Sequence, residues 1–146
     1  MQHYQIRPAQ MNDIEAVKKL ANANRHALGF VRRASLRESC QRGWLLVAQA
    51  HGQVIGFCHF RHCKSALRTT IYELCVEQQW RGQGIGRALV EEVKRQLVEQ
   101  GLLHLQLKAG ANLPANAFYE HIGLQYIREI EGRQPSLKLW QWWPAA

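Results

Sequence analysis

Apolar and polar residues recur along the chain with two periods, and these periods divide it into strands and helices. The segment YQIRPA, residues 4–9, has the alternation of a short first strand, which Pro8 ends. The next apolar residues recur at the spacing of one helix face, and Asn12 or Asp13 can cap that helix. Its predicted buried residues are Ile14, Val17, Leu20 and Ala21.

The middle of the chain has strand character after one more helix. Residues 35–38 read S-x-x-E, the form of a capping box, so we expect a second short helix from Ser35 that Gly43 ends. WLLVAQA and QVIGFCHF flank a turn at His51–Gly52 and predict an antiparallel hairpin. RTTIYELCV, residues 68–76, is rich in β-branched and aromatic residues and predicts a further strand.

The last half of the chain returns to a helical period before it closes with strands. From Gly84 to Gln100 an apolar stripe recurs every fourth residue, at Ile85, Leu89, Val93 and Leu97. LLHLQLK predicts a strand, NLPANAFYEHIG a short helix capped by Asn112, and LQYIREIE and PSLKLWQWW two final strands. The predicted order, β-α-α-β-β-β-α-β-α-β-β, indicates a mixed α/β fold in a single domain.

Composition and charge narrow the class of protein. The 146 residues are the size of one domain, and we expect residues 1–146 to form it. No run approaches the roughly 18 apolar residues of a membrane helix, and the first ten residues do not resemble a signal peptide, so we expect a cytoplasmic protein with no membrane partner. The net charge of +8 favours an anionic partner such as a polyphosphate ligand. Nothing resembles a known RNA-binding motif or recognition helix, so a nucleic-acid partner is not expected.

The segment FCHFRHC contains four possible zinc ligands, and we expect no metal site there. The spacing of Cys58, His59, His62 and Cys63 does not match a zinc finger, and on a strand alternate side chains point to opposite faces. Because we expect a cytoplasmic protein, we also expect the four cysteines of the chain to be reduced thiols.

The stretch RGQGIGRA stands between a predicted strand and a predicted helix, and it indicates an anion site. The N–H groups at the start of a helix lack intrahelical partners, and the helix dipole is positive there. Without Cβ atoms at Gly82, Gly84 and Gly86, a phosphate can approach the backbone amides, while Arg81 and Arg87 can supply charge. The stretch lacks the Gly-Lys-Ser/Thr of a Walker loop, and its G-x-G-x-G spacing does not fit the dinucleotide fingerprint.

Two motifs in this half of the chain resemble those of the GNAT N-acetyltransferase superfamily. Residues 81–86, RGQGIG, resemble its acetyl-CoA signature [Q/R]-x-x-G-x-[G/A]. Residues 112–124, NLPANAFYEHIGL, resemble its downstream pattern N-x-x-A-x-x-[F/L]-Y-x-x-x-G-[F/L]. The clear match covers residues 70–126, and beyond it only the order of elements agrees. The resemblance implies the acyl-CoA N-acyltransferase fold, a mostly antiparallel central sheet flanked by helices, in one N-acetyltransferase domain over residues 1–146.

The resemblance also implies a site for acetyl-CoA as co-substrate. The backbone of Leu74, Cys75 and Val76 would pair with the pantetheine arm. The amides of Gly82, Gln83, Gly84, Ile85, Gly86 and Arg87 would hold the pyrophosphate, and Arg81 and Arg87 would balance its charge. Asn112 would contact the cofactor, and Tyr119 would lie near the thioester sulfur.

The implied reaction is the direct attack of a primary amine on the thioester, and it needs two proton transfers. An amine with an ordinary pKa near 10.4 must lose a proton, and the leaving thiolate must gain one or be stabilised. Tyr119 is the candidate for the second task, by proton donation or by hydrogen bonding. Glu73 is the first candidate for the base and Glu77 the second, while Glu120 and His121 are expected on the surface.

The acceptor is not identified by any motif. The resemblance implies that the N-terminal helices and C-terminal strands set acceptor specificity. Arg32, Arg33 and Arg37 lie in the first of these regions, and their charge suggests an acceptor with a carboxylate or phosphate. We expect a small-molecule or peptide amine and a possible homodimer. Two alternatives stay open, a non-catalytic acyl-CoA-binding module and a toxin-like enzyme that acetylates aminoacyl-tRNA. The tryptophans of LWQWW are expected in the core or an interface.

Overall fold

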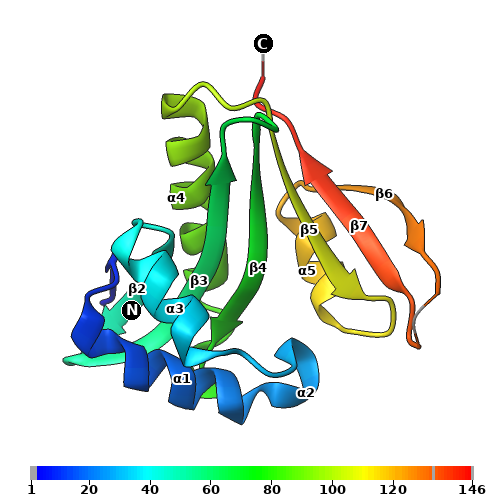
Figure 1. The fold of residues 1–146 in the computed structure, drawn as a ribbon. Coiled ribbons are helices and arrows are strands. Elements are labelled where there is room, and N and C mark those ends of the chain that lie inside the picture. The colour runs from blue at the N-terminus through cyan, green and yellow to red at the C-terminus, as the bar shows by residue number, and fades with distance from the viewer. Residues whose placement is uncertain (1–2, 133, 146) are drawn as a thin grey trace.

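A computed structural model describes residues 3–132 and 134–145, and seven strands form one sheet at its centre. The sheet order is β1-β2-β3-β4-β5-β7-β6, with β4 and β5 parallel and all other neighbours antiparallel (Figure 1). The strands are β1 (Gln5–Pro8), β2 (Leu45–Ala50), β3 (Gln53–Cys63), β4 (Arg68–Val76), β5 (His104–Gly110), β6 (Gln125–Ile130) and β7 (Leu137–Trp142).

Helices cover both faces of this sheet. The α-helices are α1 (Ile14–Ala23), α2 (Arg25–Leu28), α3 (Arg33–Gln41), α4 (Ile85–Glu99) and α5 (Ala115–His121), and the short 3-10 helices are η1 (Met11–Asp13) and η2 (Gln78–Trp80). In the view of Figure 1, α1 and α3 lie in front of the sheet, and α4 and α5 lie behind it. Across the described residues, no helix is long and apolar enough to cross a membrane.

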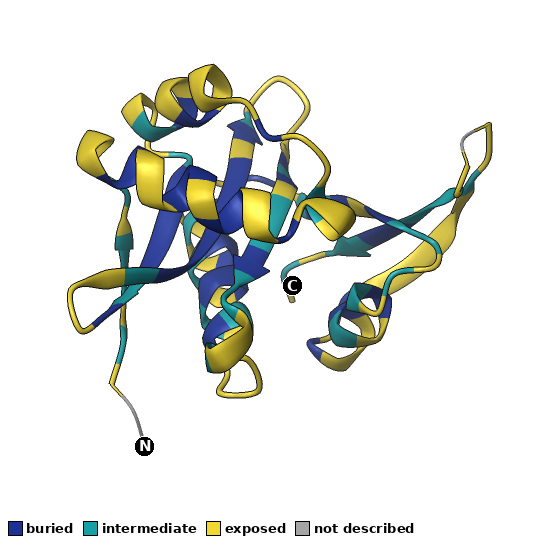
Figure 2. Ribbon diagram, turned by 90° about the horizontal axis from the view of Figure 1, so that it is seen from below, coloured by how far each residue is buried: buried dark blue, intermediate teal, exposed yellow. Residues whose placement is uncertain are grey.

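Two hydrophobic cores follow from this arrangement, one on each face of the sheet. The predicted face of α1 is buried against β2 and β3, in a core that includes Leu36, Val47 and Phe57. The predicted stripe of α4 is buried in the other core, with Cys58, Phe60 and Trp140. Figure 2 shows the buried residues concentrated on the central strands and on the helix faces turned toward them.

The sheet divides between β4 and β5, and this division creates the space for a site. The two strands pair only where Arg68–Ile71 meets His104–Leu107. Beyond Ile71, β4 continues to Val76 beside β3, whereas β5 turns away with β7 and β6 (Figure 1). Among the described residues, one backbone edge of β4 is therefore left without a neighbouring strand from Tyr72 onward.

The structure confirms the predicted fold class and corrects two local predictions. The helix predicted from Ser35 begins at Arg33 with Arg32 at its N-cap, so the capping-box prediction is wrong. The helix predicted to be capped by Asn112 begins at Ala115 with Pro114 at its N-cap. The backbone is extended at Arg32 and helical from Arg33, so Ser35 lies inside the first turn and cannot be the N-cap. Neither helix has a side-chain hydrogen bond at its N-cap. The short helix α2 was not predicted, since its four residues are too few to show a period.

Candidate active site

The unpaired edge of β4 presents backbone groups to the space between β4 and β5. The N–H of Glu77 donates to the Ile55 carbonyl of β3 at 2.8 Å. Along a strand, the backbone groups of successive residues point to alternate sides. Cys75 therefore directs its N–H and carbonyl toward β3, whereas Leu74 and Val76 direct theirs toward the open edge. Of the three predicted backbone contacts, Leu74 and Val76 have the suitable direction.

The glycine loop leads directly into α4, and its glycines have two different roles. Gly82 and Gly84 have φ values of +79° and +84°, a conformation that favours glycine, and a Cβ there would meet no atom within 4 Å. The space in front of these amides is thus open. Gly86 is different, because a Cβ there would lie 3.1 Å from Phe118 Cζ. Gly86 allows α5 to pack closely against α4.

The two arginines of the loop have different surroundings. Arg81 donates through Nε to the Val76 carbonyl at 3.0 Å and through its terminal nitrogen to Asn24 Oδ1 at 2.7 Å. It therefore ties the end of α1 to the end of β4. Arg87, on the first turn of α4, is exposed and forms no ion pair within the described part of the chain. Gln83 is also exposed, and Ile85 is buried in the core.

Tyr119 lies on α5 at the side of β4 that faces α4. Its side chain belongs to the same core as Cys58, and its ring centroid is 6.2 Å from that of Trp140. Burial raises the pKa of the Tyr119 phenol, and the nearby Cys58 raises it further. The phenol therefore stays protonated and can donate a hydrogen bond.

Asn116 fixes the position of the helix that carries Tyr119, and sequence reasoning missed it. Its Nδ2 donates to the Gly110 carbonyl at 2.8 Å and to the Leu113 carbonyl at 2.9 Å, while its Oδ1 accepts from Trp140 Nε1 at 2.8 Å. These bonds join α5 to the end of β5 and to β7. The only sequence signal was an asparagine inside a short helix, where this residue is unfavourable. Asn112 is exposed in the preceding turn.

A bulge in β4 turns the Glu73 side chain to the face of the strand opposite that of Ile71. The pairing of β3 with β4 shifts between His59, which faces Glu73, and Phe60, which faces Ile71, so that Tyr72 is the extra residue. Ile71 belongs to the core beside α4, whereas Glu73 and Tyr72 line a cavity beside α3. The carboxylate of Glu73 accepts at Oε1 from His59 Nδ1 at 2.7 Å.

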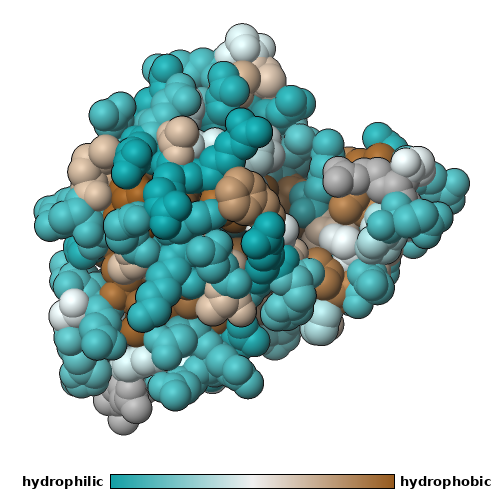
Figure 3. Space-filling model, turned by 60° about the horizontal axis from the view of Figure 1, so that its bottom comes forward, coloured by the Kyte–Doolittle hydropathy of each residue, from teal (hydrophilic) through white to brown (hydrophobic). Residues whose placement is uncertain are grey.

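The cavity beside α3 combines the carboxylates of Glu38 and Glu73 with arginines and aromatic side chains. Figure 3 shows the end of the molecule where β4 and β5 diverge. The volume of this cavity is about 500 Å³. Its cationic lining consists of Arg32, Arg42 and Arg61. Arg42 and Arg61 both lie over the ring of Trp44, at 5.3 and 5.6 Å from its centroid. Lys18, which donates to the Val31 carbonyl, holds the loop that forms one wall.

The structure thus changes the set of arginines that line a cavity near β4. Of the three predicted from sequence, Arg32 lines the cavity, but Arg33 pairs with Glu15 at 2.8 Å. Arg42 and Arg61 also line the cavity, because it draws on the end of α3 and on β3, and Arg42 is paired there with Glu38 at 3.5 Å. The second candidate base, Glu77, lines a different cavity, near Arg7 and Asp13.

The cysteines and histidines of FCHFRHC separate as the strand alternation predicts. Cys58 lies in the core beside α4, and His62 bonds Gln96 of that helix at 3.0 Å. His59 lies on the other face, bonded to Ser39 of α3 at 2.7 Å. Trp140 is buried, as expected for the core, whereas Trp143 is 45% exposed.

Comparison with known proteins places this geometry in a family. The sequence model described as the Acetyltransferase (GNAT) family matches residues 10–124. The chain belongs to the GNAT acetyltransferase family. It is an acetyl-CoA-dependent N-acetyltransferase, and acetyl-CoA is its co-substrate.

Individual relatives agree with this membership. The 5-NmdU N-acetyltransferase of Pseudomonas phage PaMx11 is 26% identical over 140 residues, which cover 94% of this chain and 98% of that protein. The crystal structure of Ard1 from Thermoplasma volcanium has a TM-score of 0.86 at 19% identity and covers 98% of this chain and 99% of its own. The structure of yncA from Salmonella typhimurium with acetyl-CoA has a TM-score of 0.79 at 19% identity, with coverage of 99% and 97%. These structural likenesses support the GNAT fold.

The described residues fit the acetyl-CoA of a GNAT enzyme. An unpaired strand edge offers backbone donors and acceptors to an extended amide-bearing arm, in the manner of an added strand. The open amides of Gly82 and Gly84 precede a helix of 15 residues, the arrangement that binds phosphate.

Proposed function

We propose that this chain transfers the acetyl group of acetyl-CoA directly to a primary amine of a small molecule or peptide, and that this acceptor also carries an anionic group. The observation that carries the proposal is the cavity in which Glu73 stands among Arg32, Arg42 and Arg61. A carboxylate attracts the ammonium group of the acceptor, and the arginines suit a carboxylate or phosphate on the same molecule.

The two sides of β4 divide the chemistry between two residues. Acetyl-CoA supplies the acetyl group as a thioester, and attack by the amine releases CoA thiolate. Glu73, on the side of the cavity, takes the proton that the ammonium must lose before its nitrogen can attack. Because Glu73 and Tyr119 lie on opposite faces of the strand, acceptor and cofactor can be bound together in a ternary complex.

Tyr119 is assigned to the thiolate side as a hydrogen-bond donor. Its raised pKa makes it a weaker acid than the thiol, for which an ordinary pKa is about 8.5. Complete proton transfer from the phenol to the thiolate is therefore unfavourable. A hydrogen bond from a protonated, buried phenol still stabilises the negative charge as it develops on sulfur.

The remaining residues hold the cofactor. The backbone of Leu74 and Val76 pairs with the pantetheine arm, and the amides from Gly82 to Arg87 bind the pyrophosphate. Arg87 balances the phosphate charge, while Arg81 orients the loop through its bonds to Val76 and Asn24. Asn112, exposed in the turn after β5, contacts the cofactor.

The test is a CoA-thiol release assay with matched pairs of amines that differ only in an anionic group. Suitable pairs are an amino acid and its amide, and an aminoalkyl phosphate and the parent amino alcohol. We expect a roughly tenfold higher kcat/KM for each anionic member, about 1.4 kcal/mol of selectivity. Arg42→Gln and Arg61→Gln should reduce that preference, with the exposed Arg128→Gln as control. Equal rates within every pair would contradict the proposed acceptor class.

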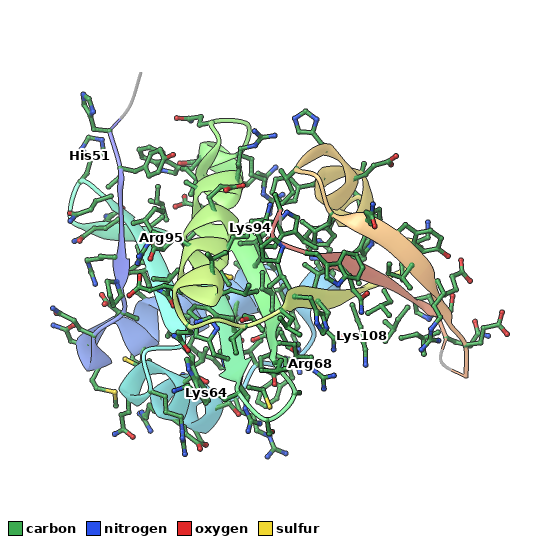
Figure 4. All side chains as sticks on the ribbon, turned by 90° about the horizontal axis from the view of Figure 1, so that it is seen from above. His51, Lys64, Arg68, Lys94, Arg95 and Lys108 are labelled. Carbon is green, nitrogen blue, oxygen red and sulfur yellow. The ribbon has the colours of Figure 1, made fainter. Side chains whose placement is uncertain are left out.

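A second acceptor, 5-NmdU itself, is favoured by the phage relative that matches nearly the whole chain. The assay therefore includes 5-NmdU, free and within an oligonucleotide. The distribution of charge argues for the free form, because the basic residues labelled in Figure 4 are spread over the β2–β3 turn, the β3–β4 turn, β4, α4 and β5. Arg95 of α4 is moreover paired with Glu92 and Glu99. Acetylation of the oligonucleotide in preference to the free form would reverse this choice and bring a nucleic-acid partner into the mechanism.

A further inference from the structure

Three polar side chains from three different elements form a continuous chain of hydrogen bonds at the cavity. Ser39 Oγ of α3 lies 2.7 Å from His59 Nε2 of β3, and His59 Nδ1 lies 2.7 Å from Glu73 Oε1 of β4. Ser39 and His59 are buried, with 9% and 6% of their surface exposed. The side chain of Glu73 is 16% exposed. Each of the three residues lines the cavity.

The hydrogen-bond chemistry assigns the direction of this chain. An ionised carboxylate can only accept, so His59 Nδ1 carries the proton that it donates to Glu73. In the neutral imidazole the other nitrogen is then an acceptor, and Ser39 donates its hydroxyl proton to it. Ser39 therefore fixes the tautomer of His59, and His59 fixes one oxygen of Glu73.

This arrangement leaves the second carboxylate oxygen to the cavity. Glu73 Oε2 has no hydrogen-bond partner among the described residues. Because no fully buried side-chain oxygen of those residues lacks a partner, Oε2 is not fully buried. Among the described residues, Glu73 also forms no ion pair with the nearby Arg42 or Arg61. A carboxylate held by an arginine would be a weaker base, because the positive charge favours its ionised form.

We propose that His59 and Ser39 are positioning residues for the acetyl transfer. His59 holds Oε1 of Glu73 by a neutral donor, keeps the carboxylate away from the arginines, and turns Oε2 toward the acceptor amine. Ser39 acts one step further out, by locking the tautomer of His59. The inference rests on the proposed role of Glu73 as the base, and it names the two residues that set the direction of that base.

The same order of bonds, Ser-His-Glu, occurs in hydrolases with a serine nucleophile. Here Ser39 lies within α3, whose backbone N–H groups are used by the helix itself. No pair of N–H groups beside Ser39 is therefore free to stabilise an oxyanion, which a nucleophilic serine requires. The geometry favours positioning, and acylation of Ser39 becomes an outcome of the test.

The test compares three substitutions of His59 that differ in where they place a donor. His59→Asn puts an amide nitrogen near the position of Nδ1 and keeps the bond to Glu73. His59→Gln puts it near Nε2, beside Ser39, and His59→Leu removes both bonds. We expect kcat to fall at least 30-fold in His59→Leu and His59→Gln but no more than about fivefold in His59→Asn, with the KM for acetyl-CoA within threefold of wild type in all.

Glu73→Gln and the double variant Glu73→Gln/His59→Leu separate the two proposals. If His59 acts through Glu73, the double variant loses no more activity than Glu73→Gln alone. Full activity of Glu73→Gln would contradict the base assignment itself. An inactive Glu73→Gln with a fully active His59→Leu would overturn only the positioning role.

Ser39→Ala and a search for acyl-enzyme complete the design. Ser39→Ala should reduce kcat about threefold to tenfold and leave the KM for acetyl-CoA unchanged, because His59 keeps its bond to Glu73. Equal losses in His59→Asn and His59→Leu would overturn the inference, as would a mass increase of one acetyl group on Ser39 after incubation with acetyl-CoA. The thermal midpoint of each variant confirms folding, and His59→Asn is the decisive variant if His59→Leu does not fold.

Discussion

At the scale of single residues, neighbours decide what two similar arginines can do. Arg81 has its guanidinium bonded to a backbone carbonyl and to Asn24, whereas Arg87 is exposed at the first turn of α4. A guanidinium that is already hydrogen-bonded must give up those bonds before it can contact a phosphate, whereas one without such bonds can contact it directly. The glycine motif places both arginines beside the anion site, but the folded chain distinguishes them.

Arg87→Ala is therefore expected to weaken CoA binding about tenfold, by about 1.4 kcal/mol, because one phosphate contact is lost. Arg81→Ala should change the CoA dissociation constant less than threefold but reduce the free energy of unfolding by about 1 kcal/mol. Isothermal titration calorimetry with CoA and urea denaturation measure the two quantities. The reverse ranking of the two variants in CoA affinity would show that Arg81 leaves its present partners to bind phosphate.

The phenol of Tyr119 gives a second test at this scale. Tyr119→Phe removes the donor without changing the packing, so kcat should fall about 100-fold while CoA affinity stays within threefold. Steady-state kinetics and calorimetry distinguish the two effects. Phe118→Leu, on the same helix, is the control for altered packing. An unchanged kcat in Tyr119→Phe would remove this residue from the reaction.

At the scale of elements, the periodic segments were predictable and the contacts between distant segments were not. The stripes of α1 and α4 are visible in the sequence because one face of each helix is buried. The start of α3 was not visible in the sequence, because S-x-x-E at Ser35 is only a local signal and the helix begins two residues earlier, at Arg33. The bond between His59 and Glu73 spans 14 residues and depends on the bulge at Tyr72, which no local pattern reveals.

The attachment of α5 provides a prediction at this scale. Asn116→Ala removes the bonds to Gly110, Leu113 and Trp140 and leaves the Trp140 N–H buried without its partner, so we expect a loss of about 2–3 kcal/mol in unfolding free energy. Because α5 carries Tyr119, kcat should also fall. Glu120→Ala, an exposed position on the same helix, is the control for both measurements. Wild-type stability in Asn116→Ala would show that the packing of α5 alone holds it.

At the scale of the whole molecule, one sheet is paired at one end and divided at the other. The site lies where β4 and β5 have separated, and the opposite end must hold the strands together. There His62 Nδ1 accepts from Thr69 of β4 at 2.7 Å, and Nε2 donates to Gln96 of α4 at 3.0 Å. This buried group joins β3, β4 and α4 just where β4 still pairs with β5.

The buried His62 makes the stability of the molecule dependent on pH. Burial lowers the pKa of His62 below its ordinary value of 6.5. The unfolded chain therefore takes up this proton first as the pH falls, so the stabilisation is fully present above pH 6.5 and is lost progressively below it. Urea denaturation of the wild type between pH 8 and pH 5 should show this loss.

His62→Gln isolates the effect of this one group from those of other titrating residues. Glutamine can still bond Gln96 but does not titrate, so the variant should be less stable than wild type at pH 8, and the difference should narrow as the pH falls to 5. The Asp13 carboxyl, whose pKa is lowered by its hydrogen bonds from Arg7, loses its contribution only below its ordinary value of 3.8 and leaves this range undisturbed. A difference that stayed constant from pH 8 to pH 5 would mean that His62 has the same pKa in the folded and the unfolded chain, which would contradict this prediction.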